Sequence, residues 1–355
     1  MIIATQNAWD NLHELLQRIR RSLQPLGSAV EIVIVDEAVP NEARQGLSQC
    51  SDAYPLQIVE SPTKGGLAKT VLNGIKAANH HIIVVMSADL RHPPEKIPEL
   101  ISQLQNGADI AIGSRYTTAG ASESSHFAQK ITRRGADLLA RTLFREIRNV
   151  TDIESGFFAL RKDVVTRANL NPVGDNILLE LLVQGDYHSV SEVKYEAETR
   201  DAIGLKEGGK NTAYDFRHLS SLFWRSGEFH RFFKFCAVGA VGAVLNLLVL
   251  YLLTERGVFY LLSGLIAIEA GLLSNFFLNK SWTFKDRGTQ GLRSVLIALY
   301  RDHAVRFVGI VLNLVILWLL TSVFGLYYLA SQVIGIAAAM LWNYGGNQWW
   351  TWETA

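Results

Sequence analysis

Apolar and polar positions in the first half of the chain alternate between two patterns. Short runs rich in β-branched residues are followed by stretches whose apolar positions recur at helical spacing. The runs that predict strands are Met1–Ala4, Glu31–Val35, Leu56–Val59, His81–Met86 and Ile110–Ile112. The stretches that predict helices include Asn11–Leu23, Ala68–Ala78 and Lys96–Gln105. Such alternation favours a parallel sheet with helices on both faces, and ligands of such sheets bind beyond the carboxyl ends of the strands.

The second half of the chain has long apolar stretches instead. Four of them approach the length of about 20 residues that crosses a bilayer, namely Phe235–Leu253, Tyr260–Leu278, Val305–Phe324 and Tyr327–Trp342. A buried helical bundle in a soluble protein is the alternative, but four such runs with aromatic ends fit a membrane better. Basic residues precede the first stretch and fill the loop between the second and the third. This bias predicts that both termini and the first half lie in the cytoplasm.

The membrane half also repeats itself. The residues Asn275, Asn279, Trp282 and Thr283 have the same spacing as Asn343, Asn347, Trp350 and Thr351. The repeated unit is therefore a two-helix hairpin. Asparagines inside a span are costly unless they hydrogen-bond to each other or to a polar ligand. They either hold the helices together or line a site for a lipid headgroup, and the sequence favours neither alternative. The tryptophans are interface anchors.

Composition and charge narrow the range of functions. The net charge is +1 over 355 residues, which argues against binding of nucleic acid. The two cysteines, Cys50 and Cys236, lie one in each half, which suits a reducing compartment and forms no disulfide framework. The start of the chain lacks the features of a signal peptide. We therefore expect the first half to stay in the cytosol, attached to a multi-pass anchor in the membrane.

The change of pattern along the chain predicts two domains and a connector. Residues 1–210 form the α/β domain, residues 211–232 the connector, and residues 233–355 the all-α domain with four transmembrane helices. Leu219 and Leu222 of the connector lie at helical spacing with arginines among their neighbours. A basic amphipathic helix of this kind lies in the headgroup plane of a membrane. The alternative is an ordinary helix packed on the α/β domain.

Polar residues follow each predicted strand, and a parallel sheet brings such residues to one edge. They are Thr5, Gln6 and Asn7; Asp36 and Glu37; Lys64, Gly65 and Gly66; Ser87, Ala88 and Asp89; and Gly113, Ser114, Arg115 and Tyr116. The glycine pair precedes a helix, whose N-terminus attracts phosphate. A carboxylate in a turn after a strand is a common holder of a metal and a phosphate. The set predicts a nucleotide-type ligand, although Asp36 taken alone is also a common turn former.

Residues 1–210 contain the motifs "GLAKTVLNGIKAA", "MSADLRHPPEKIPEL", "IGSRY", "RRGADLLAR", "DIESGFFALRKDVV" and "ILLELLVQGDY". These motifs resemble those of the family 2 glycosyltransferases, which have the Rossmann-like α/β fold called GT-A. They resemble in particular the dolichol-phosphate mannose synthases and related polyprenyl-phosphate glycosyltransferases, and the second half resembles the GtrA-like membrane domain. The resemblance implies a nucleotide-sugar over the strand ends, Mg²⁺ or Mn²⁺ on an acidic DxD-type motif, and inverting transfer of the sugar to a lipid phosphate.

The chain departs from this family at the donor and metal edge. The family reads DADLQH where this chain reads SADLRH at residues 87–92. Asp89 is therefore the metal ligand that remains, with Ser87 a doubtful second, and Arg91 replaces a glutamine. The family's glutamate after the first strand is Ala8 here, and DEAV at residues 36–39 replaces its Asp-Asp-Gly-Ser. The scaffold motifs are kept, which indicates a site that has changed rather than a sequence that has decayed.

An arginine beside a retained carboxylate suggests a changed role for the metal. The acceptor phosphate has a second pKa of about 6 and needs no strong general base. The metal's task is to neutralise the leaving diphosphate, and a guanidinium group can do part of this. We expect Asp89, Arg91 and Arg115 to be catalytic, with Arg91 taking over some or all of the metal's role. The alternative is an Asp89–Arg91 ion pair in a site that no longer transfers sugar.

Basic residues predict the site of the acceptor phosphate. They are Arg115, Lys130, Arg133, Arg134, Arg200 and Lys206. Arg115, Arg200 and Lys206 match family positions for phosphate binding, whereas any single member of the set is more simply a solvated surface residue. Three further residues, Asp152, Ser155 and Gly156, match a segment that the family places near the sugar.

The sequence thus predicts a membrane-bound hexosyltransferase that uses a GDP-mannose or UDP-glucose type of donor and a polyprenyl phosphate acceptor. The sequence does not choose between mannose and glucose, and it leaves association into a homo-oligomer open. The alternative function is that of a non-catalytic homologue that binds lipid or assists the flipping of lipid-linked sugars.

Overall fold

The computed structural model describes residues 1–5, 8–27, 29–36, 39–40, 55–60, 66–115, 135, 137–196, 212–287 and 291–352. The chain divides into two compact units. Unit 1 consists of Met1–Asp137 and Glu146–Leu222, and unit 2 of Leu138–Arg145 and Phe223–Ala355. A short piece of the first half thus belongs with the helices of the second half. The domain boundaries expected from the sequence remain predictions.

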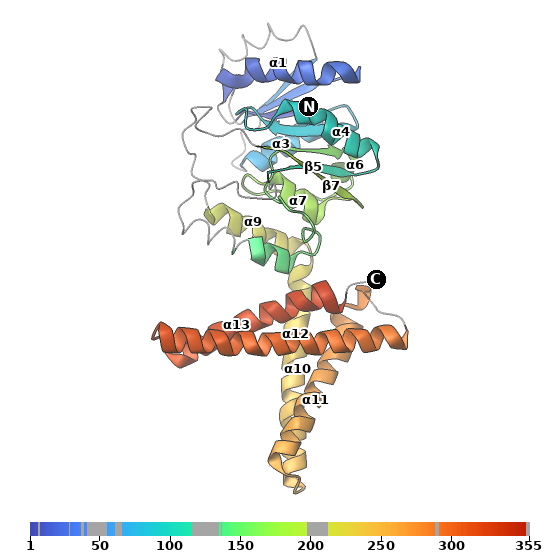
Figure 1. Cartoon of the computed structure of the whole chain (residues 1–355). Helices are drawn as coiled ribbons and strands as arrows, with labels where there is room; N and C mark the ends of the chain where they lie inside the picture. The colour runs from blue at the N-terminus through green and yellow to red at the C-terminus, as the bar shows by residue number, and fades with distance from the viewer. Residues whose placement is uncertain are drawn as a thin grey trace. The chain divides into compact units, whose positions relative to one another are not determined.

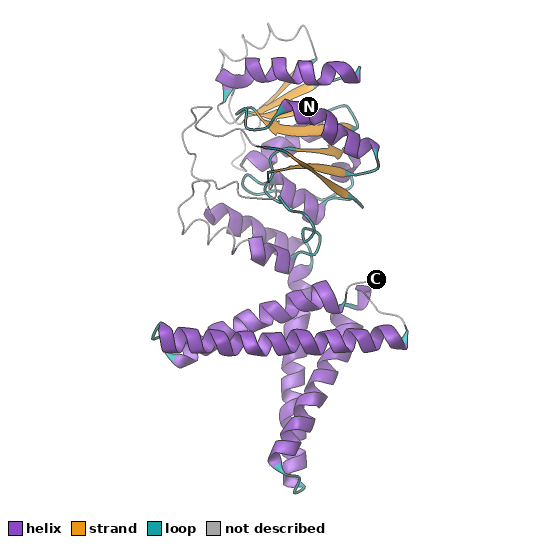
Figure 2. Ribbon diagram, in the orientation of Figure 1, coloured by secondary structure: helices purple, strands orange, loops and turns teal. Residues whose placement is uncertain are grey.

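A mixed sheet lies at the centre of unit 1 (Figures 1 and 2). The described strands are β1 (Ile2–Ala4), β2 (Ile32–Asp36), β3 (Leu56–Glu60), β4 (Ile82–Ser87), β5 (Ile110–Ser114), β6 (Phe158–Arg161) and β7 (Val190–Lys194). They lie in the order β3–β2–β1–β4–β6–β5–β7. The five predicted strands are confirmed to within two residues at each end. The described strands are parallel as expected except for β6, which runs antiparallel to both β4 and β5.

Helices cover both faces of this sheet, as the alternating pattern predicts. In unit 1 they are α1 (Leu12–Leu23), α3 (Leu67–Ala77), α4 (Ile97–Gln105), α6 (Asp163–Thr166) and α7 (Ile177–Gln184), and a further helix, α9 (Thr212–Arg225), begins in unit 1 and ends in unit 2. Leu15 and Ile19 of α1 and Leu100 of α4 are fully buried in the core on one face. On the other face, a Cβ atom at Gly74 of α3 would overlap Val35 of β2. The sheet is therefore buried on both sides, and its carboxyl edge is left to carry polar residues.

Helix α9 packs against unit 1 through a buried polar pair. Nε2 of His218 in α9 lies 3.1 Å from Oε2 of Glu180 in α7, and both side chains are buried. Leu219 and Leu222 of α9 are buried as well. For this part of the connector, the packing favours a helix docked on the α/β domain. The expectation that the connector lies in the headgroup plane remains a prediction.

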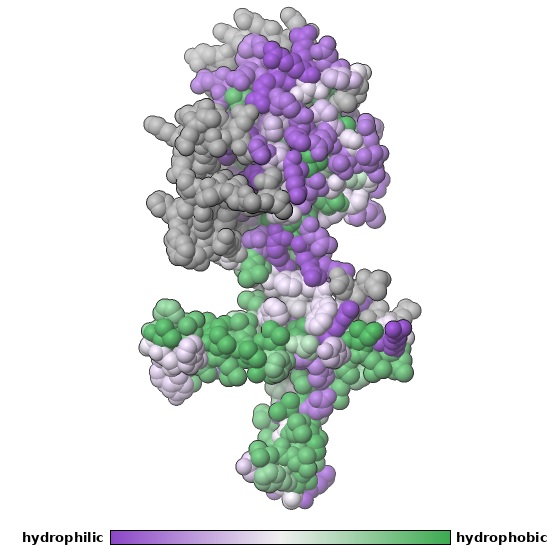
Figure 3. Space-filling view, viewed as in Figure 1, coloured by the Kyte–Doolittle hydropathy of each residue, from purple (hydrophilic) through white to green (hydrophobic). Residues whose placement is uncertain are grey.

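Unit 2 contains two helical hairpins. Its long helices are α10 (Glu228–Glu255), α11 (Tyr260–Leu278), α12 (Leu292–Trp318) and α13 (Tyr328–Gly346), and π-helical turns extend the last three at η4 (Asn279–Thr283), η6 (Leu319–Val323) and η7 (Asn347–Thr351). Large apolar side chains are exposed on all four helices, for example Leu247, Leu265, Phe307 and Val333. Figure 3 shows this surface in green.

Three of the described helices are long and apolar enough to cross a membrane, namely Glu228–Glu255, Tyr260–Thr283 and Leu292–Val323. They include the first three stretches predicted from the sequence, apart from Phe324 at the end of the third. The fourth stretch coincides with most of α13, which contains the polar residue Gln332, and its crossing of the membrane remains a prediction.

The internal repeat of the sequence recurs as a repeated packing contact. A Cβ atom at Gly242 of α10 would overlap Oδ1 of Asn275 in α11, and a Cβ atom at Gly309 of α12 would overlap Oδ1 of Asn343 in α13. Small residues allow paired membrane helices to approach this closely. Both Oδ1 atoms are buried and have no hydrogen-bond partner within the described part of the chain. The two asparagines therefore lie in the tight contact within each hairpin, and their role, helix adhesion or a lipid headgroup site, remains a prediction.

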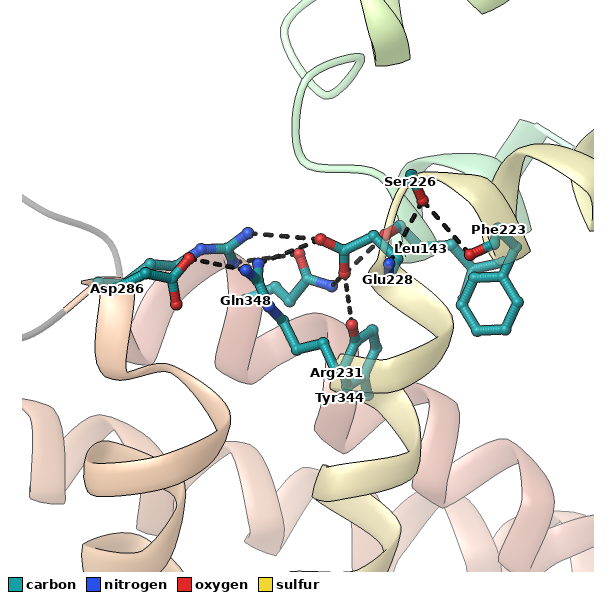
Figure 4. Close-up of polar contacts among 9 residues, drawn as sticks. Leu143, Phe223, Ser226, Glu228, Arg231, Asp286, Tyr344 and Gln348 are labelled. Atoms are coloured by element: carbon teal, nitrogen blue, oxygen red, sulfur yellow. Dashed lines mark hydrogen bonds and ion pairs between the residues drawn. The ribbon is translucent and has the colours of Figure 1, made fainter. Parts of the chain in front are cut away.

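A buried carboxylate joins the helix ends of unit 2 (Figure 4). Glu228, the first residue of α10, accepts hydrogen bonds from the Tyr344 hydroxyl, from Nε2 of Gln348 at 2.8 Å and from Arg231 at 3.1 Å. Nε2 of Gln348 also donates to the carbonyl oxygen of Leu143 at 3.4 Å. Glu228 therefore ties together both hairpins and the short piece of the first half. Its partners satisfy the charge, as a buried carboxylate requires.

We expect Gly242→Ala and Gly309→Ala each to destabilise the chain by about 1–3 kcal/mol, because the added methyl group must displace a buried asparagine. Gly239→Ala is the matched control, because a Cβ atom at Gly239 in the same helix as Gly242 would meet nothing within 4 Å. Thermal unfolding of the full chain in detergent measures the difference. Equal melting temperatures for all three variants would show that the helices do not pack this closely.

Candidate active site

The site lies along the edge of the sheet where β1, β2, β4, β5 and β7 end. These strands run in one direction, whereas β6 runs in the opposite direction. The loop that precedes β6 therefore reaches the same edge. Across the sheet this edge carries Asp36, Thr5, the turn at 87–92, the loop at 152–157, Arg115 and Tyr195. We call this set of residues the rim.

Thr5 and Asp36 meet at the ends of β1 and β2. The Thr5 hydroxyl donates a hydrogen bond to Oδ2 of Asp36, and both residues are buried. The backbone N–H of Thr5 donates to the carbonyl oxygen of Val35 at 3.2 Å. The structure thus brings together two residues that the sequence assigned to the nucleotide-sugar.

The start of α3, predicted to attract phosphate, is occupied by groups of the protein. Gly66 has a φ angle of 76°, and a Cβ atom there would overlap the backbone of Gly174. The N–H of Ala68 donates to the Gly174 carbonyl at 3.0 Å, and the N–H of Leu67 donates to Oδ1 of Asp175 at 3.3 Å. The close approach that glycine allows here is therefore an approach to another loop of the same unit.

A tight turn after β4 brings Asp89 and Arg91 together. Leu90 between them has a φ angle of 59°, in the left-handed region, which costs a non-glycine residue about 1–2 kcal/mol. Its buried side chain holds it there. The Arg91 guanidinium donates to Oδ2 of Asp89, and the Arg91 N–H donates to Oδ1 at 3.3 Å. Burial raises the pKa of Asp89, but the hydrogen bond and charge of Arg91 outweigh it and hold that pKa below its usual value.

Ser87 and Ala88 fix the start of this turn. Ala88 is fully buried, and its N–H donates to the carbonyl oxygen of Ala4 at 2.9 Å. The Ser87 hydroxyl oxygen accepts a long hydrogen bond from the Asp89 N–H at 3.5 Å. Ser87 thus supports the turn at the position where the related family has a second carboxylate.

His92 lies at the centre of the rim. Its Nδ1 accepts a hydrogen bond from the Ser87 N–H at 3.0 Å, and its ring stacks on Phe157 with centroids 5.3 Å apart. Burial lowers the pKa of His92 to about 4, and the charges of Asp89, Arg91, Arg115 and Asp152 also act on it. The imidazole is therefore neutral near pH 7 and accepts a hydrogen bond from the backbone through Nδ1.

Arg115 is held in place at the end of β5 by a carboxylate from the loop before β6. Its Nε and Nη2 donate to Oδ2 and Oδ1 of Asp152, each at 2.8 Å, and its N–H donates to Oδ2 at 3.2 Å. Asp152 is 1% exposed. Burial raises the pKa of Asp152, but Arg115 outweighs this and holds that pKa below the usual value. The bidentate geometry orients the guanidinium group.

Ser155 and Gly156 shape the backbone between the two arginines. The Ser155 hydroxyl donates to the carbonyl oxygen of Gly113 at 2.6 Å and is buried. A Cβ atom at Gly156 would lie 3.3 Å from Cε1 of His92, so a side chain there would press on the imidazole. Both residues therefore support the centre of the rim.

Sequence reasoning missed Tyr195 and the central place of His92. Tyr195 directly follows β7, and its ring packs edge-on against Phe157 with centroids 5.5 Å apart. A Cβ atom at Gly113 would overlap Phe157 and lie 3.2 Å from Cε1 of Tyr195, so the glycine leaves space for both rings. No pattern in the local sequence marks either residue for this place in the site.

Several predicted site residues lie outside the residues that the structure describes. In the nucleotide-sugar set they are Asn7, Glu37, Lys64 and Gly65. In the acceptor set they are Lys130, Arg133, Arg134, Arg200 and Lys206. Their assignment stays a prediction. Of the acceptor set, Arg115 alone is described, and it lies at the rim.

The carboxylates of the described rim do not fit a divalent metal site. Asp36 accepts a hydrogen bond from Thr5, Asp89 pairs with Arg91, and Asp152 pairs with Arg115. Within the described ranges, no three residues of the types His, Cys, Asp and Glu gather as metal ligands. Hard cations such as Mg²⁺ prefer several anionic or carbonyl oxygens, whereas here two arginines already neutralise the carboxylates.

Two family models match the chain. The model described as glycosyl transferase family 2 matches residues 1–167, and the model described as GtrA/DPMS, transmembrane domain matches residues 234–352. Together with the sheet and the apolar helices, they define the class of the protein. It is a membrane protein with a GT-A glycosyltransferase domain followed by a helical GtrA-like domain.

Relatives narrow the class to a family. The chain is 38% identical over 356 residues to the dolichol-phosphate mannosyltransferase of Pyrococcus furiosus. The aligned region covers 100% of this chain and 99% of the relative. It is 31% identical to the dolichol-phosphate mannosyltransferase of Mycosarcoma maydis over 68% of this chain and 82% of the relative. The chain belongs to the dolichol-phosphate mannosyltransferase family, and it is a glycosyltransferase.

Among solved structures, glucosyl-3-phosphoglycerate synthase from Mycobacterium tuberculosis in complex with Mn²⁺, UDP-glucose and phosphoglyceric acid is similar with a TM-score of 0.43 and 16% identity. The matched region covers 64% of this chain and 79% of the chain of that structure. Mannosyl-3-phosphoglycerate synthase from Rubrobacter xylanophilus is similar with a TM-score of 0.47 and 13% identity, and covers 64% and 75%.

We predict that the free energy of unfolding falls as the pH is lowered from 6.5 to about 4. In this window the unfolded chain binds a proton at position 92, whose ordinary pKa is 6.5, while folded His92 with a pKa of about 4 does not. The loss is at most roughly 3 kcal/mol. Chemical denaturation of the wild type and of His92→Gln across this window measures the slope. The variant should show a shallower slope, and an equal slope in both would contradict the assignment.

Proposed function

We propose that this glycosyltransferase moves a hexose, mannose or glucose, from a nucleotide-sugar to a polyprenyl phosphate of the dolichyl type. The reaction would take place at the cytoplasmic face of the membrane, where the α/β domain and both termini lie, with inversion at the sugar carbon. The observation that carries the proposal is the gathering of Arg91 and Arg115 around neutral His92 at the strand ends. The full-length similarity to a protein named dolichol-phosphate mannosyltransferase supports the acceptor.

The chemistry requires charge neutralisation more than proton transfer. A phosphate monoester has a second pKa of about 6, so near pH 7 the acceptor attacks without a strong base. The leaving nucleoside diphosphate develops charge that must be stabilised. Neutral His92 adds no charge to this region, and Asp152 holds Arg115 in a fixed direction. We assign Arg91 to the leaving diphosphate and Arg115 to the acceptor phosphate.

Arg91 takes over the charge-neutralising role for which related enzymes use a metal. Its guanidinium already balances Asp89, the acidic residue of the motif that this chain retains. When the diphosphate arrives, Arg91 can shift its hydrogen bonds from the carboxylate to phosphate oxygens, for which its planar group is suited. Mg²⁺ or Mn²⁺, expected from the family resemblance, remains a prediction that the described carboxylates do not support.

A second function, binding of lipid without transfer, is favoured by one observation. The Asp89–Arg91 ion pair is closed, with the Asp89 side chain 11% exposed. If this ion pair never opened, the donor diphosphate could not bind Arg91. The protein would then bind a polyprenyl phosphate at the membrane without transferring sugar to it.

The direct test is transfer of label from radiolabelled GDP-mannose and UDP-glucose to a polyprenyl phosphate by the full chain in detergent. The reaction is run with Mg²⁺, with Mn²⁺ and with EDTA. Label in the lipid extract is the expected result, and its survival in EDTA supports the role of Arg91. Absence of label with both donors under every condition would reject the transferase and leave the lipid-binding function.

Arg91→Gln should lower the transfer rate by about 10²–10³-fold, because it removes a positive group from the developing charge. Arg18→Gln is the matched control. Arg18 forms an ion pair with Glu95 at 2.9 Å outside the rim, and its loss should leave the rate near that of the wild type. Initial rates with saturating donor measure the effect. If Arg91→Gln retained both the rate and the metal response of the wild type, Arg91 would have no role in neutralising the diphosphate.

A further inference from the structure

The Tyr195 hydroxyl is a buried polar group without a partner. Tyr195 is 3% exposed, and its Oη atom has no hydrogen bond to any residue in the part of the chain that the structure describes. An unpaired buried hydroxyl costs free energy, and buried tyrosines usually find a hydrogen-bond partner. At the edge of an active site, such a group indicates the position of a ligand atom.

The Tyr195 ring is fixed by its neighbours, so the hydroxyl cannot easily turn away to find water. Its centroid lies 5.5 Å from that of Phe157 and 6.2 Å from that of His92, edge-on to both. The N–H of Tyr195 donates to the Ser114 carbonyl oxygen at 3.1 Å, which anchors the residue to β5. The missing side chain of Gly113 gives the ring its space. The direction of the hydroxyl is therefore set before a ligand binds.

The surroundings of Tyr195 favour an anionic ligand oxygen. Burial raises the pKa of the phenol, so the group remains an O–H donor near pH 7, and the charges of Arg115, Asp152, Arg91 and Asp89 act on it. The two carboxylates are already paired with the two arginines. A hydroxyl donor that lies within the electrostatic reach of two guanidinium groups matches the oxygens of a phosphate.

We propose that the Tyr195 hydroxyl donates a hydrogen bond to a phosphate oxygen that is bound between Arg91 and Arg115. The inference rests on the proposed function, which supplies two such groups, the diphosphate of the donor and the monoester of the acceptor. Their chemistry is the same at this oxygen, and the experiment separates them. Tyr195 binds the phosphate and takes no part in bond making or breaking.

Two variants that each remove one tyrosine hydroxyl test the proposal. Tyr195→Phe removes the unpaired group, so the ligand-free chain should melt at the same temperature as the wild type or higher. Tyr187→Phe is the matched control, because the Tyr187 hydroxyl donates to the carbonyl oxygen of Leu182 at 2.7 Å. Its removal should lower the melting temperature. A purely structural role for the Tyr195 hydroxyl would lower the melting temperature of Tyr195→Phe as well.

Binding of GDP, UDP and farnesyl phosphate to the full chain in detergent is then measured by calorimetry. Tyr195→Phe should weaken binding by about tenfold, as expected for one hydrogen bond to a charged group, while Tyr187→Phe binds like the wild type. A loss confined to GDP and UDP assigns the contact to the donor diphosphate, and a loss confined to farnesyl phosphate assigns it to the acceptor. A loss with both classes places the contact where the two phosphates meet.

Unchanged affinity of Tyr195→Phe for all three probes would overturn the inference, and so would a wild type that binds none of them. The proposed function fails by a different result, namely a wild type that binds the probes but transfers no sugar. In that case, weaker binding by Tyr195→Phe would still establish the phosphate contact.

Discussion

The ion pair between Asp89 and Arg91 determines what the rest of the rim can do. It places a fixed positive group at the end of β4, where the diphosphate of a nucleotide-sugar is expected, and leaves the retained carboxylate neutralised. A strained residue, Leu90, keeps the two side chains on the same side of the turn. The imidazole at the centre of the rim is neutral near pH 7, because burial lowers the pKa of His92.

The antiparallel strand β6 explains how distant parts of the sequence reach this ion pair. It lies between β4 and β5 and enters the sheet at the rim, so Asp152 and Ser155 arrive from the opposite direction. Asp152 forms an ion pair with Arg115, and the ring of Phe157 stacks on the ring of His92. One strand thus links Arg91, which we propose to bind the donor, to Arg115, which we propose to bind the acceptor.

The sequence predicted the part of the fold that repeats a simple pattern. Five strands and their helices follow from apolar periodicity, and the strand-end rule brought Asp36, Asp89 and Arg115 to one edge. Strands β6 and β7 were not predicted; β7 is half-exposed with mixed polarity, so periodicity does not reveal it.

The site could be predicted only as far as strand order allows. The sequence offered the pairing of Asp89 with Arg91 as one of two alternatives. The pairing of Arg115 with Asp152 could not be predicted, because it depends on the direction of β6. The roles of His92 and Tyr195 arise from ring contacts across three strands, which have no signature in local sequence. In the membrane half, the repeated asparagines were visible in the sequence, but their glycine partners Gly242 and Gly309 emerge only from helix pairing.

The central claim is that Arg91, rather than a divalent cation, neutralises the diphosphate of the donor. Calorimetric titration of the full chain with GDP and UDP, once in EDTA and once in Mg²⁺, tests it without dependence on turnover. The account predicts the same affinity in both conditions, and loss of that affinity in Arg91→Gln. Binding that occurs only in the presence of Mg²⁺ would contradict it.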